Sequence, residues 1–272
     1  MPADIAVVIP TFRRPATLPD ALRSVLGQRD VGLEVLVVDD DPEGSAETVV
    51  RGFDDPRVRY VRNPRPSGGY PGAVRNFGWP LTSAPVLHFM DDDDLLPEGL
   101  YAAALAAFAT PPRVGVVYGH AEPFGESQDA VERDRELFLS SARRSIRLDW
   151  LGGAHWAYAT CLLFKGLLYM GGASLIRREC LEAIGGYSGD MRVFEDVDLH
   201  SRVTRRFGAR YLQRASLLYR VSASSQMHSV SGELQAALEQ AYARMYANYR
   251  RMYGDLDFYA LKIAARTLLR SL

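Results

Sequence analysis

The sequence predicts an α/β fold in which a mainly parallel sheet is flanked by helices. Short runs of apolar, β-branched residues alternate along the chain with segments whose apolar residues recur at helical intervals. This alternation is typical of right-handed β-α-β units, which generate parallel strands. The composition, 47% hydrophobic and 24% charged over 272 residues, suits one large α/β domain or two small ones.

Each element is assigned from its local pattern, and most expected strands end in proline, glycine or acidic residues. Strands are predicted at residues 5–9, 33–38, 58–61, 84–89, 114–118, 171–176 and 217–221. Helices are predicted at residues 17–28, 45–51, 73–81, 97–109 and 195–207, before the glycine pair at 185–186, and over the amphipathic tail 232–272. Residues 120–150 lack a clean period, so a loop with some helix is expected there.

Composition also limits the classes of partner and location. A formal net charge of −1 gives no electrostatic reason to expect a nucleic-acid partner. Cys161 and Cys180 lack metal or redox spacing and suit reduced thiols in the cytoplasm. The N-terminus does not resemble a signal peptide, and the most apolar run, 161–170, is about half the length of a membrane span. We therefore expect no transmembrane segment and a cytoplasmic protein, at most peripheral to the membrane.

Two acidic clusters and one proline turn follow predicted strands directly. Pro10-Thr11-Phe12 ends the first strand, Asp39-Asp40-Asp41 ends the second, and Asp91 to Asp94 follow the strand at 84–89. The carboxyl ends of parallel strands meet at one edge of a sheet, where ligands bind, so these residues should line one crevice. Grouped carboxylates suit Mg²⁺ or Mn²⁺, which commonly accompany phosphates. The pattern therefore predicts diphosphate chemistry.

Some of these residues also have a purely structural interpretation. Asp94 and the residues after it resemble a helix start, with Asp94 as the cap. The cluster 39–41 can be a turn whose side chains bond their own backbone. Glu195, Asp196 and Asp198 would occupy the first turn of a helix, where the helix dipole favours acids.

Four further residues are candidates on single-residue grounds. Arg75 precedes the strand at 84–89 and could pair with a diphosphate. His228 follows the last predicted strand in a serine-rich loop, where it could be a metal ligand. His155 and Trp156 lie in an aromatic, glycine-rich segment that could stack an acceptor sugar, although core packing explains it equally well.

Two common nucleotide-binding motifs are missing. The glycine-rich segment 68–72 lacks the Gly-Lys-Ser/Thr ending of a P-loop, and it precedes a strand rather than following a strong one. No Gly-x-Gly-x-x-Gly follows the first strand, which argues against a nicotinamide-binding Rossmann domain.

The order and spacing of the pieces resemble the family 2 glycosyltransferases of GT-A fold. The matching segments are 8–14, 37–41, 73–78, 89–94 and 194–199 with Arg202, within about residues 5–221. The resemblance implies a GT-A type, Rossmann-like sheet and a C-terminal helical tail. It also implies an inverting, metal-dependent transfer, with Mn²⁺ or Mg²⁺, from a nucleotide-diphosphate-sugar donor to a hydroxyl of a saccharide or other acceptor.

The resemblance gives a role to each matching position. Donor-binding residues would be Pro10, Thr11, Phe12, Arg14, Asp39, Asp40, Arg75, Asp91 and Asp92. Asp93 would bind the metal, with Asp91 as a further ligand, and Asp196 would be the general base with Glu195 beside it. His228 lies outside the matching segments and is expected as an additional metal ligand only from its place in the serine-rich loop. The family commonly shows Asp-Asp-Gly-Ser where this chain has Asp39-Asp40-Asp41-Pro42, which leaves open the carboxylate that holds the base.

The expected organisation is a catalytic domain over 1–225, with a nucleotide-sugar half at about 1–118 and an acceptor half at about 119–225. A helical extension over 226–272 follows. Its stripe of apolar residues would form a homodimer or pack back on its own domain; the stripe comprises Leu234, Leu238, Tyr242, Met245 and Tyr249.

Two other functions remain open from the sequence. A sugar-phosphate nucleotidyltransferase would share the fold class and the metal, but it should carry a glycine-rich, basic loop after the first strand, where this chain has Pro-Thr-Phe-Arg-Arg. A catalytically idle nucleotide-sugar binding module would keep Asp91 to Asp93 but would not need the acidic pair Glu195 and Asp196.

Overall fold

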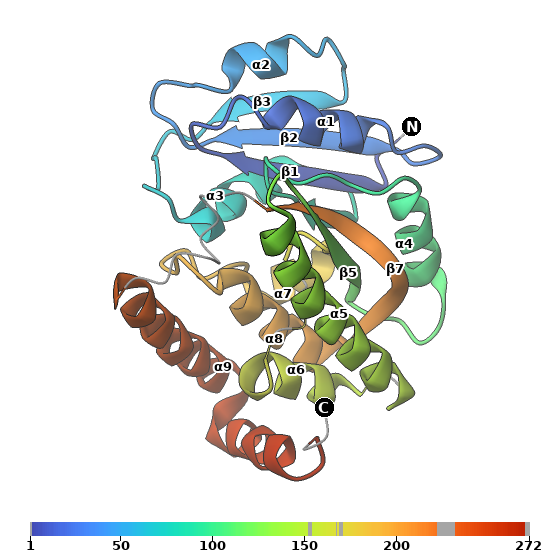
Figure 1. The fold of residues 1–272 in the computed structure, drawn as a ribbon, viewed down its shortest axis with the longest axis vertical. Helices are drawn as coiled ribbons and strands as arrows, with labels where there is room; N and C mark the ends of the chain where they lie inside the picture. The colour runs from blue at the N-terminus through green and yellow to red at the C-terminus, as the bar shows by residue number, and fades with distance from the viewer. Residues whose placement is uncertain (1, 152–153, 167, 169–170, 222–231, 270–272) are drawn as a thin grey trace.

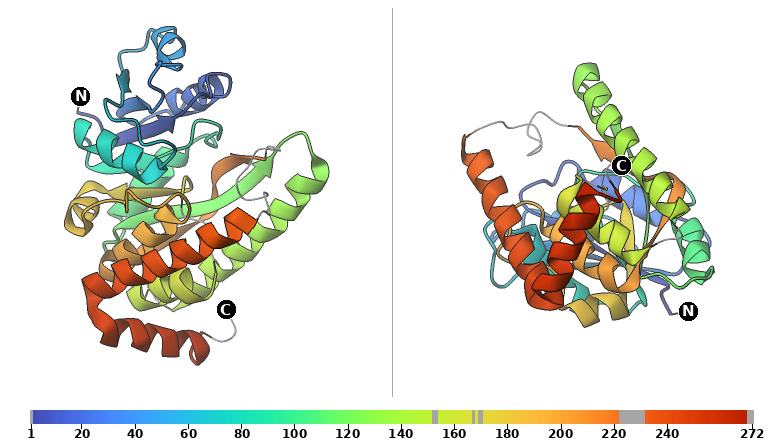
Figure 2. Two further views of the ribbon diagram at one scale, coloured as in Figure 1. Left: turned by 90° about the vertical axis from the view of Figure 1, so that its left-hand side faces the viewer. Right: turned by 90° about the horizontal axis from the view of Figure 1, so that it is seen from below.

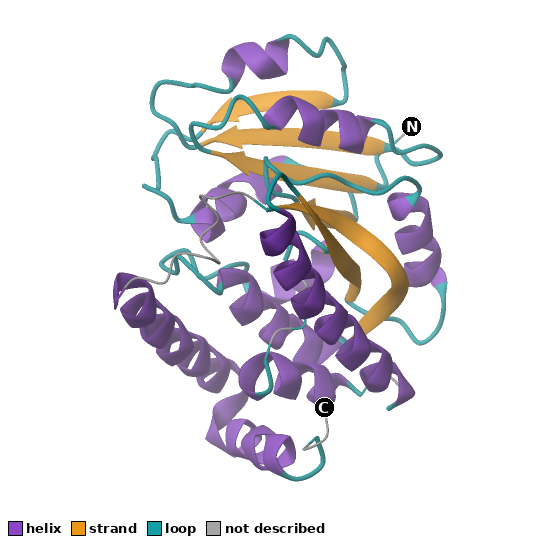
Figure 3. Ribbon diagram, viewed as in Figure 1, coloured by secondary structure: helices purple, strands orange, loops and turns teal. Residues whose placement is uncertain are grey.

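The computed structural model describes residues 2–151, 154–166, 168, 171–221 and 232–269. A seven-stranded sheet of order β3-β2-β1-β4-β6-β5-β7 forms its centre, with helices on both faces (Figure 1, Figure 3). The strands are β1 Ile5–Thr11, β2 Leu33–Asp39, β3 Val58–Arg62, β4 Val86–Phe89, β5 Val116–Phe124, β6 Ser174–Arg177 and β7 Ala209–Arg220.

The helices fill the connections between the strands. They are α1 Leu18–Leu26, α2 Glu47–Arg51, α3 Pro71–Gly78, α4 Leu100–Ala109, α5 Gln128–Trp150, α6 His155–Phe164, α7 Arg178–Ile184, α8 Glu195–Phe207 and α9 Gly232–Arg266, with a 3₁₀ turn η1 at Trp79–Leu81. Apolar residues of α1 and α4 pack on one face of the sheet, and those of α3, α6, α7, α8 and α9 pack on the other. The unbroken apolar run Ile5–Ile9 predicts a strand that is buried on both faces. The structure agrees, because helices cover both sides of β1.

Strand pairing confirms the predicted mainly parallel sheet. β1 pairs in parallel with β2 and β4, and β2 pairs in parallel with β3. β6 runs antiparallel to both β4 and β5, while β5 and β7 are parallel. The register sets Thr11 opposite Asp39 and Val8 opposite Phe89, so both acidic clusters follow neighbours of β1 at the same edge.

The expectation of a loop with some helix over residues 120–150 is confirmed for the helix and wrong for the loop. β5 continues to Phe124, and the 23-residue helix α5 follows it. Buried residues recur every three or four positions along α5 and form its inward face. They include both apolar and polar side chains, namely Val131, Asp134, Phe138, Ser141, Ser145 and Leu148. The helical period is present, but its buried polar residues hide it from a hydrophobic pattern.

Asp94 is structural but does not cap a helix, which corrects the expectation for this residue. α4 begins only at Leu100, after Gly99 in the left-handed region at φ 69°. The Asp94 carboxylate instead accepts the Arg220 backbone N–H at 2.9 Å, beside the bridge between Leu95 and Leu218. Asp94 therefore fastens the end of β4 to β7.

The C-terminal helix packs mainly on its own domain. Met245 and Tyr249 of the predicted stripe are fully buried against the main core, and Tyr246 donates to the Leu163 carbonyl of α6 at 3.2 Å. Tyr242 is 41% exposed, and the side chain of Leu234 lies outside the described residues. α9 bends at Gly254, where φ is 83° and ψ 165°. Among the described residues, no helix is long and apolar enough to cross a membrane.

Candidate active site

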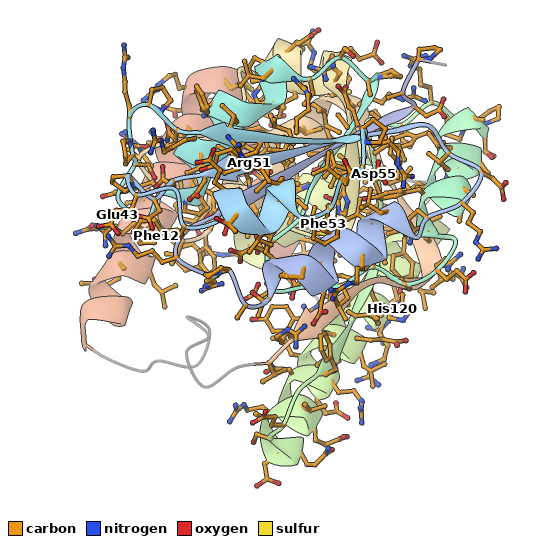
Figure 4. The ribbon with its side chains drawn as sticks, turned by 90° about the horizontal axis from the view of Figure 1, so that it is seen from above. Phe12, Glu43, Arg51, Phe53, Asp55 and His120 are labelled. Atoms are coloured by element: carbon orange, nitrogen blue, oxygen red, sulfur yellow. The ribbon has the colours of Figure 1, made fainter. Side chains whose placement is uncertain are left out.

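The candidate site lies where β1, β2 and β4 end, opposite the start of α8. The Thr11 hydroxyl donates to Asp92 Oδ2 at 2.6 Å and joins the end of β1 to the acidic run after β4. Phe12 follows with 41% of its surface exposed. Figure 4 shows Phe12 and Glu43 projecting at the same end of the sheet, the end toward which β2 points in Figure 1. Pro10, within β1, is half-buried opposite Val38.

Asp39 is fully buried, and the protein itself binds both of its oxygens. Oδ1 accepts the Asp41 N–H at 3.0 Å, and Oδ2 accepts the Ala46 N–H at 2.9 Å and the Tyr60 hydroxyl at 3.1 Å. These bonds shape the turn between β2 and α2, as the structural interpretation of this cluster predicts.

Asp40 is held in a similar way by the loop after β3. Asn63 Nδ2 donates to Oδ1 at 2.7 Å, and the Ser67 hydroxyl donates to Oδ2 at 2.7 Å. The Ser67 backbone N–H donates to the same carboxylate at 2.9 Å. With 2% of its surface exposed, Asp40 fixes this loop beside the end of β2.

The four carboxylates after β4 occupy different environments, and they therefore differ in pKa and in whether a ligand can reach them. Asp92 is buried, and burial raises its pKa to about 7. The Asp91 and Asp93 side chains remain 45% and 24% exposed. Arg14 Nη1 binds Asp93 Oδ2 at 2.7 Å and reaches Asp92 Oδ1 at 3.5 Å. Asp91 and Asp93 are therefore the carboxylates of this run that a ligand can reach.

Arg75 links these carboxylates to α8. Its guanidinium is buried and donates to Asp91 Oδ1 at 2.7 Å and to Glu195 Oε1 at 2.6 Å. Its carbon Cζ lies 5.4 Å from the centre of the Tyr187 ring. The Nε donor of Arg75 has no hydrogen-bond partner among the described residues. One buried cation thus touches both halves of the site and retains a free donor.

The neighbouring residue on α3 strengthens this link. Asn76 Nδ2 donates to the Tyr187 carbonyl at 2.9 Å, and Asn76 Oδ1 accepts the Tyr187 N–H at 2.9 Å. Glu195 is itself buried, and burial, opposed by Arg75, raises its pKa to about 7. Helix α3 therefore fixes both the segment that leads to α8 and the first residue of α8.

Asp196 occupies an open position at the start of α8. The preceding Phe194 is in the left-handed region at φ 61°, a strained conformation for a bulky residue that recurs at functional sites. Asp196 is half-buried, and its Oδ1 accepts the Val197 N–H at 2.8 Å. Its Oδ2 faces Gly171, where an added Cβ would lie only 2.7 Å away. The glycine thus makes room for the carboxylate.

A buried histidine supports the same turn. His200 Nδ1 lies 2.7 Å from the Asp196 carbonyl oxygen, and His200 Nε2 lies 2.8 Å from Ser174 Oγ. Burial lowers the pKa of His200, so the ring is neutral at this position. The ring connects α8 to the strand that follows Gly171.

The structure does not bring His155 and Trp156 into this cluster. His155, at the start of α6, lies beside Gly208, which follows the last residue of α8. Asp196 is at the other end of that helix, which is about 20 Å long at 1.5 Å per residue. Trp156 packs partly buried against the main core, the alternative left open by the sequence. His228 lies outside the described residues.

A cavity of about 230 Å³ adjoins α8 on another side. Phe194 and Val197 of the α8 start, Leu162 to Phe164 of α6, and Tyr242 and Tyr246 of α9 line it. The Phe194 and Tyr242 rings meet edge to face, with centroids 5.3 Å apart.

Tyr187, Gly171 and the Arg75–Glu195 contact are the features that sequence reasoning missed. The glycine pair that opens the strand predicted at 171–176 was the available signal, because glycines within a strand often mark a close approach. No local pattern indicates the contact between Arg75 and Glu195, which are 120 positions apart.

The exposed carboxylates fit a divalent metal only together with a ligand. Among the described residues, no group of three or more histidine, cysteine or acidic side chains is placed to hold an ion. Mg²⁺ and Mn²⁺ are commonly bound by one or two carboxylates, with substrate phosphates and water completing the coordination. Asp91 and Asp93 could supply these one or two carboxylates.

Two solved structures resemble this fold. S. aureus TarS, in complex with UDP-GlcNAc, superposes with a TM-score of 0.62 at 14% identity, covering 92% of this chain and 71% of that one. The mannosyltransferase PcManGT from Pyrobaculum calidifontis, in complex with GDP-Man and Mn²⁺, gives a TM-score of 0.57 at 16% identity, covering 99% of this chain and 81% of that one. These likenesses confirm the predicted GT-A type fold.

Sequence relatives align over shorter stretches. The GalNAc(5)-diNAcBac-PP-undecaprenol beta-1,3-glucosyltransferase of Campylobacter jejuni is 34% identical over 97 residues, 35% of this chain and 31% of the relative. The validoxylamine A glucosyltransferase of Streptomyces hygroscopicus is 36% identical over 118 residues, 42% of this chain and 28% of the relative. The alignments thus span less than a third of either relative.

The family assignment rests on a longer match. Residues 6–185, well over half of the chain, match the family described as Glycosyl transferase family 2. The matched residues include β1 from its second residue, the acidic clusters at the ends of β2 and β4, and Arg75. The chain belongs to glycosyl transferase family 2.

Proposed function

We propose that this protein is an inverting glycosyltransferase that moves a sugar from a nucleotide-diphosphate-sugar donor to an acceptor hydroxyl. The observation that carries the proposal is the position of Arg75. Its guanidinium binds Asp91, at the end of β4, and Glu195, next to Asp196 on α8. A diphosphate near Asp91 and a base at Asp196 would therefore be held on either side of one fixed cation.

The donor half of the proposed site uses the edge formed by β1, β2 and β4. The exposed Phe12 ring offers a stacking surface for the base, and Arg14 and Arg75 offer cations for the diphosphate. Asp91 and Asp92 would serve the ribose side, with Thr11 fixing Asp92. The complexes of the structural neighbours with UDP-GlcNAc and GDP-Man support a nucleotide-sugar donor without specifying its base.

The role of Asp39 and Asp40 is proposed to be indirect. Their oxygens are already bound by the turn before α2 and by the loop after β3. We infer that Asp39 and Asp40 shape the walls beside the nucleotide base. They would keep their present hydrogen bonds and would not bind the base themselves.

A divalent ion, Mn²⁺ or Mg²⁺, would bind at Asp93 with Asp91 and would neutralise charge on the leaving diphosphate. The Mn²⁺ in the mannosyltransferase complex supports this proposal. Arg14 binds Asp93 here and would shift toward a phosphate oxygen when the donor is bound. His228 remains a proposed further ligand.

Asp196 is the proposed general base. Its Oδ2 would accept the proton of the acceptor hydroxyl as the hydroxyl oxygen attacks the anomeric carbon. The nucleotide diphosphate leaves from the opposite side of that carbon, so the anomeric configuration inverts. Glu195, committed to Arg75 at 2.6 Å, would position that cation, not act as the base.

The acceptor would approach from the α8 side. We propose that the aromatic cavity beside Phe194, with Tyr242 and Tyr246 in its wall, receives part of the acceptor, since aromatic faces stack on sugar rings. The proposed nucleotide-sugar half remains at about 1–118 and the acceptor half at about 119–225, and the extension at 226–272 contributes Tyr242 and Tyr246 to the acceptor cavity. The acceptors named for the two relatives differ, so they support a hydroxyl acceptor but no particular one.

The proposed setting is the cytoplasm, consistent with two free, buried cysteines. A homodimer through α9 has less support than the sequence suggests, because Met245 and Tyr249 are covered by the chain itself. An idle binding module has no need of the Asp196 arrangement, and family membership favours a transferase over a nucleotidyltransferase.

Two measurements test the proposal. Nucleotide diphosphates with Mn²⁺ should raise the Tm in a thermal-shift panel, and the matching base should raise it most. With the donor so identified, NMR of the product should show the anomeric configuration opposite to that of the donor. A product with retained configuration would contradict the single displacement, and a panel without any stabilising nucleotide would contradict the donor class.

A further inference from the structure

The last part of α9 has an unusual outer face. After the bend at Gly254, the inward residues Phe258, Leu261 and Leu269 are 5%, 4% and 2% exposed and pack on the main core. Figure 2 shows that this segment forms the outermost element at its end of the molecule, and Figure 1 shows it remote from β1, β2 and β3.

Large apolar side chains on the outer side of this segment are strongly exposed. Leu256 is 91% exposed, Ile263 63% and Leu268 71%, and Tyr259 is 51% exposed. Every other large apolar residue described as exposed lies between 39% and 46%. The spacing of Leu256, Tyr259 and Ile263, three and then four residues apart, puts them on one helical face, and Leu268 follows in the turn after the end of α9 at Arg266. The most exposed apolar groups of the described chain therefore gather within 13 positions.

The charges around this face are unbalanced. Asp255 is ion-paired with Arg250, and Asp257 with Arg205 of α8. No other acidic residue lies between positions 250 and 268. The two cations that follow the bend, Lys262 and Arg266, form no ion pair within the described residues. The surface thus combines an apolar stripe with unpaired positive charge.

We propose that this outer face, defined by Leu256, Tyr259, Ile263 and Leu268, docks on the anionic surface of a phospholipid bilayer. A helix with an exposed aliphatic and aromatic face and flanking cations lies in the membrane interface, where the apolar side chains enter the acyl boundary and the cations meet lipid phosphates. Tyrosine is favoured at that depth because its ring is apolar and its hydroxyl is polar.

Charge favours a lipid surface over a second copy of this chain. A symmetric contact through the same face would bring the unpaired cations of one copy toward those of the other. The segment offers no unpaired acid to compensate them. An anionic bilayer supplies that compensation, at roughly 1 kcal/mol for each cation near the surface.

The test is sedimentation of the full chain with lipid vesicles. The protein should bind vesicles of phosphatidylcholine mixed with phosphatidylglycerol, and it should bind pure phosphatidylcholine much more weakly. Replacing both Leu256 and Ile263 by Ser should weaken binding on the order of 100-fold, since each buried side chain contributes about a factor of ten. Lys262→Glu with Arg266→Glu should reduce binding and its dependence on salt.

Leu139→Ser is the matched control. Leu139 lies on α5 and is 43% exposed, so its replacement changes surface apolarity without touching the proposed face. Because all the substituted side chains are exposed or at the surface, unfolding curves should match the wild type. The proposal is overturned if the Leu256→Ser, Ile263→Ser protein binds vesicles like the wild type. It is equally overturned if the wild type does not bind anionic vesicles; a dimer in light scattering that these two substitutions abolish would then assign the face to a second copy of the chain.

Discussion

Replacing Gly171 by alanine should displace the proposed base without disturbing the donor site. The new Cβ would lie 2.7 Å from Asp196 Oδ2, whereas ordinary contact begins at 3.4 Å. The carboxylate must therefore retreat by about 0.7 Å, which its short side chain can do by rotation. The fold should remain intact because the strained contact is made with the end of a side chain.

The expected loss follows from that displacement. Misplacing a reacting group by 1 Å costs about 10²-fold in rate, so Gly171→Ala should lower kcat by roughly 10- to 10²-fold. Donor affinity should be unchanged, because Asp91, Asp93 and Arg75 do not contact Gly171. The assay pairs initial rates at saturating donor with calorimetry of donor binding.

Gly172→Ala is the matched control for this experiment. Its added Cβ would lie 3.4 Å from Leu217 Cδ2, an ordinary contact, and would not approach Asp196. The control should keep the wild-type rate. Equal, near-wild-type rates for the two alanine variants would refute the claim that Gly171 makes room for a working Asp196.

Three other perturbations have defined outcomes. Asp94→Ala should destabilise the fold by about 1 to 3 kcal/mol in urea unfolding because the Arg220 N–H loses its acceptor, whereas Asp94→Asn should recover most of the loss; equal losses would contradict this. Asp93→Ala, like excess chelator, should abolish transfer and weaken diphosphate binding, and full activity in chelator would contradict metal use. His88 is buried, and burial lowers its pKa to about 4 from a usual 6.5. The contribution of neutral His88 to the free energy of unfolding is therefore complete above pH 6.5. As the pH falls toward 4, up to about 3 kcal/mol of this stability is lost. Urea unfolding measured at several pH values should show that His88→Gln removes this loss of stability between pH 6.5 and 4. An unchanged pH dependence of the unfolding free energy would contradict the prediction.

The first half of the fold follows closely from local sequence. β1, β2 and β4 are short, apolar and β-branched or aromatic, and a proline or aspartate lies within two residues of the end of each, so their approximate bounds and their shared edge can be predicted. Helix α5 could not be predicted because Asp134 and Ser145 occupy its inward face. A hydrophobic pattern cannot recognise a buried stripe that is partly polar.

The candidate site could be predicted in its residue types but not in its connections. The sequence indicates carboxylates at strand ends, yet the pairing of Arg75 with Glu195 and of Asp40 with Ser67 depends on tertiary packing. Likewise, the spacing of Met245 and Tyr249 shows an apolar stripe but not that their own domain covers it. Periodicity identifies a face, and only the fold determines its partner.

The most direct test of the central claim is the Asp196→Asn variant. This substitution keeps the shape of the side chain and removes its ability to accept a proton. Donor binding measured by calorimetry should survive, while turnover should fall by about 10²- to 10⁴-fold, the usual contribution of a general base. Transfer at near the wild-type rate by Asp196→Asn would contradict the assignment and locate the base elsewhere.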